Sequence, residues 1–151
     1  MSGQPPAAGR RGHAVHMSVA VLSTTRRPIT APSLYELHRA VGWWPQRTEE
    51  DYTFVLRTCP AVGAWDDSAL IGFARAISDG RLHAYVDDVM VDPGWRRQGI
   101  AVRLVDTLVD TLDGVPVITL FCGAEPVPLY EGSSFVSTRQ VVLHRQRGAD
   151  A

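Results

Sequence analysis

Apolar stretches of this chain are separated by short breaks rich in glycine, proline and aspartate, and each break marks the end of a predicted element. One apolar run ends at Val91 and is stopped by Asp92-Pro93-Gly94, which is typical of a strand. The run after it is amphipathic, which predicts a helix. The pattern predicts strands at 19–23, 62–65, 70–77, 83–91, 115–121 and 136–143, and helices at 33–42, 48–59, 100–112 and 124–130.

This order of elements predicts an α/β domain with a mixed sheet. Ser33-Leu-Tyr-Glu36 has the form of a capping box and predicts the start of the first long helix, while Thr48 is the predicted cap of the second. A chain of 151 residues is long enough for one core and too short for two. We expect the domain to span 17–145, with a disordered tail at 1–16 and a short tail at 146–151.

Composition excludes several classes of protein. A net charge of −1 lacks the basic excess of nucleic-acid-binding proteins, and every one of the 15 basic residues is arginine. No apolar run approaches the roughly 20 residues of a membrane helix. The distant Cys59 and Cys122 predict neither a disulfide nor a metal site, and they favour a reducing cytoplasm. We therefore expect no nucleic acid, membrane or metal as a partner.

A basic loop, Arg96-Arg97-Gln98-Gly99, connects the strand that ends at Val91 to the amphipathic helix. Free backbone N–H groups and the positive end of a helix dipole make such a junction an anion site. The loop fits the pattern Arg/Gln-x-x-Gly-x-Gly/Ala, whereas neither a P-loop nor a dinucleotide-binding glycine pattern is present. The alternative interpretation is an ordinary helix start with a turn glycine.

In this setting the loop resembles the pyrophosphate loop of the Gcn5-related N-acetyltransferase (GNAT) family, which binds acetyl-CoA. The family has the same order of elements, and the resemblance covers about residues 18–144. Leu129-Tyr-Glu-Gly-Ser-Ser-Phe135 is similar to the family's Phe-Tyr-Glu-Lys-x-Gly-Phe segment, with Ser134 in place of glycine. The resemblance implies a GNAT-like mixed, mainly antiparallel central sheet with splayed central strands and flanking helices.

The resemblance also implies how acetyl-CoA binds as the cosubstrate. Backbone N–H groups after Arg96 would hold the pyrophosphate, and the arginines could add charge-assisted contacts. The cofactor-binding residues implied at the loop are Arg96, Arg97, Gln98, Gly99, Ile100, Ala101 and Val102. Backbone groups of Val89, Met90 and Val91 would receive the thioester carbonyl and the pantetheine arm.

An amine acceptor must lose a proton, because its pKa lies near ~10 for a lysine-like group. The resemblance implies Asp87 as the general base, through a water, and Tyr130 as the general acid. Side chains two apart on a strand share a face, so Asp88 should point away from Asp87 unless a bulge, expected near Val89-Met90, begins earlier. The alternative interpretations are that Asp87 and Asp88 form a solvated acidic pair at the end of a strand and that Tyr130 is a half-buried helix tyrosine.

Trp43 and Trp44 follow the first long helix, in the loop that walls the acceptor pocket in the family. We expect them to bind substrate together with Tyr85 and Asp88; the alternative is a buried tryptophan anchor. These residues predict a cytoplasmic N-acetyltransferase that acts on a small-molecule primary amine. A protein N-terminal or lysine acetyltransferase and a non-catalytic CoA-binding module are alternatives, and the sequence leaves a homodimer open.

Overall fold

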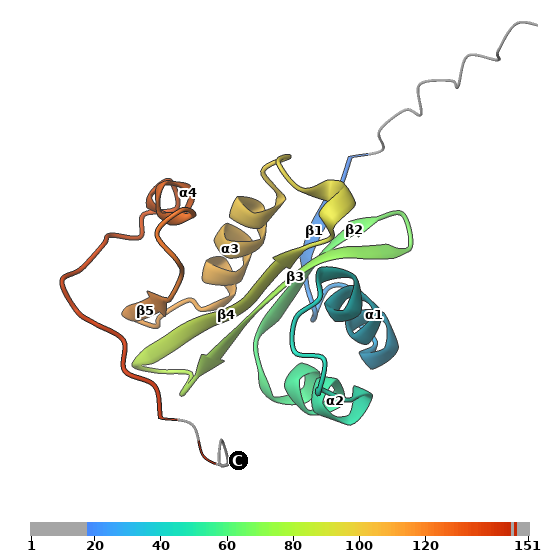
Figure 1. Ribbon diagram of the computed structural model, residues 1–151, viewed down its shortest axis with the longest axis horizontal. Helices are drawn as coiled ribbons and strands as arrows, with labels where there is room; N and C mark the ends of the chain where they lie inside the picture. The colour runs from blue at the N-terminus through green and yellow to red at the C-terminus, as the bar shows by residue number, and fades with distance from the viewer. Residues whose placement is uncertain (1–17, 146, 148–151) are drawn as a thin grey trace, which may run out of the picture.

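The computed structural model describes residues 18–145 and 147 (Figure 1). The predicted tail at 1–16 lies outside them, as does most of the tail at 146–151. The strands are β1 (Ala20–Ser23), β2 (Ala61–Asp66), β3 (Ala69–Ser78), β4 (His83–Val91) and β5 (Val117–Leu120). The helices are α1 (Ala31–Val41), α2 (Glu49–Thr58), α3 (Ile100–Thr111) and α4 (Val127–Glu131), with a short 3-10 helix, η1 (Pro93–Trp95).

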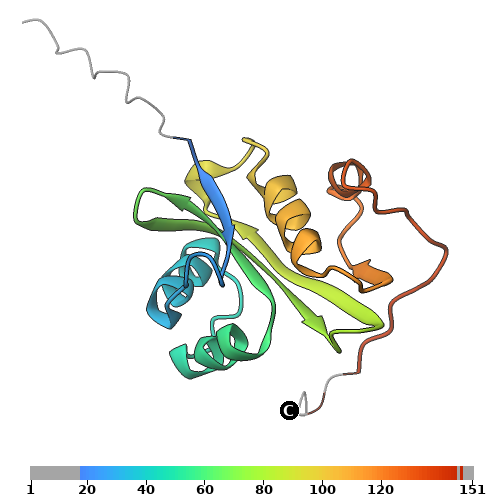
Figure 2. The same ribbon diagram turned by 180° about the vertical axis from the view of Figure 1, so that it is seen from behind.

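The strands form one sheet in the order β1-β2-β3-β4-β5. Neighbouring strands are antiparallel except β4 and β5, which are parallel and are connected through α3. Helices α1 and α2 cover one face of the sheet and α3 covers the other, as the two opposite views show (Figures 1 and 2). The predicted α/β architecture with a mixed, mainly antiparallel sheet is confirmed.

Each face of the sheet has its own hydrophobic core. On the α3 side, Ile100, Leu104 and Leu108 lie one helical turn apart and pack on the sheet. On the other side, Leu34 of α1 and Tyr52 of α2 pack on the sheet. Each fully buried large apolar side chain contributes about 1.5–3 kcal/mol, so the two cores fix the strands between them.

The starts of α1 and α2 show how far local signals predict structure. The predicted cap at Thr48 is confirmed, and the structure makes it part of a capping box: the Thr48 hydroxyl accepts from the Asp51 N–H while the Asp51 carboxylate accepts from the Thr48 N–H. The predicted cap at Ser33 is wrong: α1 begins at Ala31, and Thr30 caps it by accepting from the Ser33 N–H at 3.3 Å. Pro32 is tolerated in the first turn of a helix, where its missing N–H would have had no partner.

The predicted strand at 136–143 does not form, so β5 is an edge of the sheet in the described chain. After α4 the chain runs outside β5, and a cavity of about 1280 Å³ separates the two. Val136 and Leu143 are 82% and 89% exposed. An apolar sequence becomes a strand only by hydrogen bonding to a neighbouring strand, and this segment makes no such pairing.

Among the described residues, no helix is both long enough and apolar enough to cross a membrane.

Candidate active site

A β-bulge in β4 brings two carboxylates to one face of the sheet. β3 pairs Arg75 with Asp87 and Phe73 with Met90, so one residue of β3 faces two residues of β4. Asp88 is one of those two and adopts a left-handed conformation with φ 51°. An extra residue reverses the alternation of side chains along a strand. The bulge was expected near Val89-Met90; it begins earlier and turns Asp88 toward the face that Asp87 occupies.

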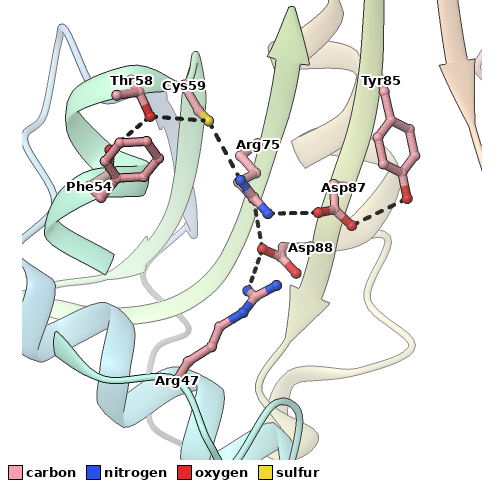
Figure 3. Close-up of polar contacts among 8 residues, drawn as sticks. All are labelled: Arg47, Phe54, Thr58, Cys59, Arg75, Tyr85, Asp87 and Asp88. Atoms are coloured by element: carbon pink, nitrogen blue, oxygen red, sulfur yellow. Dashed lines mark hydrogen bonds and ion pairs between the residues drawn. The ribbon is translucent and has the colours of Figure 1, made fainter. Parts of the chain in front are cut away.

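The guanidinium of Arg75 holds both carboxylates (Figure 3). Its Nε donates to Asp88 Oδ2 at 2.7 Å, and its Nη2 donates to Asp87 Oδ2 at 2.8 Å. A third nitrogen, Nη1, donates to the Cys59 sulfur at 3.5 Å. Arg75 is only 8% exposed. Burial disfavours its charge, yet the Asp88 carboxylate, the Cys59 contact and Asp87 together raise the pKa of Arg75, so it is a cation.

A second arginine reaches Asp88 from the loop between α1 and α2. Arg47 Nη1 lies 2.8 Å from Asp88 Oδ2, and the Arg47 guanidinium carbon lies 4.8 Å from the centre of the Trp44 ring. Asp88, 5% exposed, is therefore bound by two cations. Two arginines and two aspartates cancel in charge, which is how charged groups are tolerated when buried.

Asp87 is more accessible than its neighbour. Its side chain is 26% exposed, and its Oδ1 accepts a long hydrogen bond of 3.5 Å from the Tyr85 hydroxyl. The Tyr85 ring in turn packs against Phe121, with 4.9 Å between centroids. Asp87 is thus a partly solvated carboxylate held in place by an arginine and a tyrosine.

Asp87 borders a cavity of about 620 Å³ between the α1–α2 loop, β4 and the segment after β5. Trp43 and Trp44 line it at 44% and 47% exposure. The complete lining is Gly42, Trp43, Trp44, Val86, Asp87, Asp88, Val89, Leu120, Phe121, Cys122, Gly123, Pro126 and Tyr130. Most predicted catalytic and acceptor residues therefore meet in one mainly apolar cavity. Tyr85 is not part of this lining, but it contacts two residues that are, Asp87 and Phe121.

Tyr130 enters the cavity from α4. Burial, assisted by Cys122, raises the pKa of Tyr130, so its hydroxyl keeps its proton at neutral pH and can donate it. The following turn contains Ser134 with φ 65°, the left-handed conformation that favours glycine. Serine thus occupies a backbone conformation for which the sequence pattern has glycine.

The predicted anion loop is exposed at the start of α3. Gly99 caps α3 with φ 73°, and in the part of the chain that the structure describes no side chain caps this end of the helix. Residues 96–99 are exposed, whereas Ile100 is buried beneath α3. The first N–H groups of a helix have no partner within it, so this end fits a phosphate group. Arg96 Nε donates to the Val91 carbonyl oxygen at 3.3 Å, which ties the loop to the end of β4.

Of the other predicted cofactor-binding residues, Val89 borders the cavity, while Met90 and Val91 are buried in opposite cores. Arg75, Arg47 and Cys59 were not identified from the sequence. The sequence gives one indication, which is that Arg75 lies on an otherwise mostly apolar strand. Nothing indicates which carboxylates the two arginines bind, because these lie 12 to 41 residues away. Within the described part of the chain, no group of His, Cys, Asp and Glu could hold a metal ion.

This chain is similar in sequence and in fold to known acetyltransferases. The model of the acetyltransferase (GNAT) family matches residues 24–128. The chain is 37% identical over 82 residues to the Probable acetyltransferase TAP2 of Glycine max, covering 53% of this chain and 33% of that protein. It is 39% identical over 72 residues to the Histone acetyltransferase TAP1 of Glycine max, covering 46% and 31%. The chain thus spans about a third of the length of these curated relatives.

Among solved structures, the fold is similar to that of glucosamine-6-phosphate N-acetyltransferase from Arabidopsis thaliana. The TM-score is 0.67 at 12% identity, over 86% of this chain and 99% of that chain. At this identity the likeness is one of fold alone. The cytoplasmic location expected from the sequence stays a prediction, and the homodimer stays open.

Proposed function

Because the chain belongs to the acetyltransferase (GNAT) family, we propose that it transfers the acetyl group of acetyl-CoA directly to the primary amine of a small molecule. The observation that carries this proposal is the partly exposed Asp87 carboxylate in a mainly apolar cavity that Tyr130 also borders. In this cavity Asp87 can accept a proton and Tyr130 can donate one.

In this proposal Asp87 makes the acceptor nucleophilic. It accepts a proton from the ammonium or the attacking amine, through a water because the aspartate side chain is short. The free amine then attacks the acetyl carbonyl, so that a C–N bond forms as the C–S bond breaks. A positioned base contributes typically ~10²–10⁴-fold to the rate.

Tyr130 completes the proton balance by donating its hydroxyl proton to the departing coenzyme A sulfur. The raised pKa of Tyr130 keeps that proton available. The backbone N–H of Val89, in the bulge, would stabilise the charge that develops on the acetyl oxygen. The exposed N–H groups at Gly99 and after it, with Arg96 and Arg97, would hold the pyrophosphate.

The walls of the cavity favour an acceptor that carries one amine on an aromatic or otherwise apolar body. Trp43 and Trp44 offer it large apolar faces, and an amine cation can also bind an aromatic face. Asp88 is already neutralised by two arginines, so Asp87 is the accessible carboxylate of the pair. An acceptor with several positive charges would need several carboxylates, whereas Asp87 is the accessible one of this pair.

A protein acceptor is the second candidate, because one relative is named a histone acetyltransferase. A lysine side chain is itself an apolar stem with one terminal amine. The two candidates differ in whether the rest of the acceptor must fit inside the cavity.

Thiol release from acetyl-CoA tests both candidates. We expect faster release with phenethylamine than with spermidine, a lysine-containing peptide or a peptide with a free N-terminus. Trp44→Ala should raise KM for phenethylamine most, whereas Phe54→Ala, which removes an exposed aromatic ring of α2, serves as the control. A clear preference for peptides would replace the first candidate with the second, and no release with any acceptor would contradict both.

A further inference from the structure

We infer that Arg75 is a positioning residue for acetyl transfer, acting through Asp87; this inference rests on the proposed function. No part of the sequence pattern assigns Arg75 a role. It lies on β3, in a row of buried small and apolar residues, where an arginine needs a reason to be present.

The bulge explains the need for this arginine. Consecutive carboxylates on a regular strand point to opposite faces, but Asp88 at φ 51° shares a face with Asp87. Two like charges side by side on a half-buried surface repel each other. Arg75 binds one oxygen of each, at 2.7 and 2.8 Å, and thereby fixes their separation.

The contact with Asp87 uses Oδ2, while Oδ1 receives only the 3.5 Å contact from Tyr85. Arg75 therefore fixes the Oδ2 side of this cavity-lining carboxylate and leaves Oδ1 as its less tightly held oxygen. The Cys59 contact holds the third nitrogen of the guanidinium, so the arginine cannot turn without losing a partner (Figure 3). A misplacement of about 1 Å in a reacting group can cost about 10²-fold in rate.

Lysine cannot replace this geometry. An ammonium is a single point of charge, whereas the planar guanidinium donates in three fixed directions at once. Arg75→Lys should retain the positive charge and the fold but bind one carboxylate at a time. Arg75→Gln removes the charge as well, so that Asp88 retains Arg47 as its cation while Asp87 loses its arginine partner.

The test measures amine-dependent thiol release by Arg75→Lys, Arg75→Gln and Arg27→Gln. Arg27 is a matched control, since it donates to the Asp67 carbonyl oxygen and stacks on Trp65, outside the cavity lining. We expect both Arg75 variants to lose about 10²-fold in kcat near neutral pH. Activity should recover partly at alkaline pH, where free amine already exists. Stabilisation by coenzyme A should be unchanged.

A double-mutant cycle separates positioning from mere stability. If Arg75 acts through Asp87, then Arg75→Lys should cost nothing further in the Asp87→Asn background. Arg75→Gln with Asp88→Asn restores the charge balance, so it should recover thermal stability without recovering kcat.

Three results would overturn the positioning role while leaving the proposed function intact. They are recovery of kcat in the Arg75→Gln/Asp88→Asn variant, additive losses of activity for Arg75→Lys and Asp87→Asn, and normal activity of Arg75→Lys. Absence of amine turnover by the unaltered protein would overturn the proposed function, and this inference with it.

Discussion

Arg47 lies 2.8 Å from the Asp88 carboxylate, so the loop between α1 and α2 is tied to the bulge of β4. The same guanidinium covers the ring of Trp44, whose backbone is itself in a left-handed conformation with φ 48°. One wall of the cavity is therefore held to the strand that carries Asp87.

Removing the contact between Arg47 and Asp88 should make the loop that lines the cavity beside Asp87 more mobile. We predict that Arg47→Gln lowers the free energy of unfolding by about 1–3 kcal/mol, as for loss of a hydrogen bond to a charged group. It should also raise KM for amines while leaving stabilisation by coenzyme A unchanged. Steady-state kinetics with varied amine measure this. Arg57→Gln, which removes an arginine over the exposed Phe54 ring, is the control and should alter neither quantity.

The helix start at Gly99 should be sensitive to any side chain. Coenzyme A present at 100 times its Kd should stabilise the unaltered protein by about 2.7 kcal/mol. Gly99→Val should abolish this gain, because a side chain would block the approach of phosphate to the backbone. Gly114→Val provides a matched comparison, since both glycines have positive φ and open space around an added Cβ.

Both glycine variants should lose about 1–2 kcal/mol or more from left-handed strain alone. The predicted difference therefore appears only when coenzyme A is added, and thermal denaturation with and without it measures that difference. If coenzyme A stabilised Gly99→Val as much as Gly114→Val, the loop at Gly99 would not be the site that binds its phosphates.

Loss of the Tyr130 hydroxyl should affect the chemical step more than binding. We predict that Tyr130→Phe lowers kcat by about 10²-fold or more and changes coenzyme A affinity little, because the proton is needed when the thiolate leaves. Tyr35→Phe, on α1, is the corresponding control. A large change in coenzyme A affinity with unchanged kcat would assign Tyr130 to binding instead.

His38 should make stability fall in mild acid. It is 1% exposed, and neither ring nitrogen has a hydrogen-bond partner among the described residues. Burial lowers the pKa of His38 from 6.5 to about 4, with Asp88 opposing and Arg47 and Arg75 assisting. Between these values the unfolded chain binds a proton that the folded chain does not, so the free energy of unfolding falls as pH drops through this window.

The loss that His38 causes between pH 7.5 and pH 5 should be about 2 kcal/mol. His38→Phe cannot take up the proton and should remove that loss, while at pH 7.5 it should fold normally because it deletes two unpartnered polar atoms. Chemical denaturation at both pH values measures the change. His144→Gln, at an exposed position, should retain the full pH dependence.

Local patterns predict most of this fold because they act through nearby residues. The amphipathic period of α3, the cap at Thr48 and the turn at residues 66–68 each depend on contacts within a few positions. The same patterns fail where a distant partner decides the structure. Residues 136–143 have an apolar strand sequence, but β5 does not pair with them.

The predicted site depended on which side chains of β4 point to the same face of the sheet. The resemblance implied Asp87 as the base, and Asp87 does border the cavity, but the direction of Asp88 depends on a bulge opposite β3. Arg75 and Arg47 were missed because nothing in their local sequence indicates the carboxylates they bind 13 and 41 residues later. Their contacts with Asp87 and Asp88 follow from the pairing of β3 with β4 and from the fold of the α1–α2 loop.

The pH dependence of kcat/KM for an amine, compared between the unaltered protein and Asp87→Asn, shows whether Asp87 is the base. If Asp87 is the base, the variant should be slower by about 10²–10⁴-fold near neutral pH, and the gap should narrow at alkaline pH as free amine accumulates. Asp88→Asn should lose stability without that alkaline recovery. Identical pH profiles for the unaltered protein and Asp87→Asn, or alkaline recovery confined to Asp88→Asn, would contradict the assignment of Asp87 as the base.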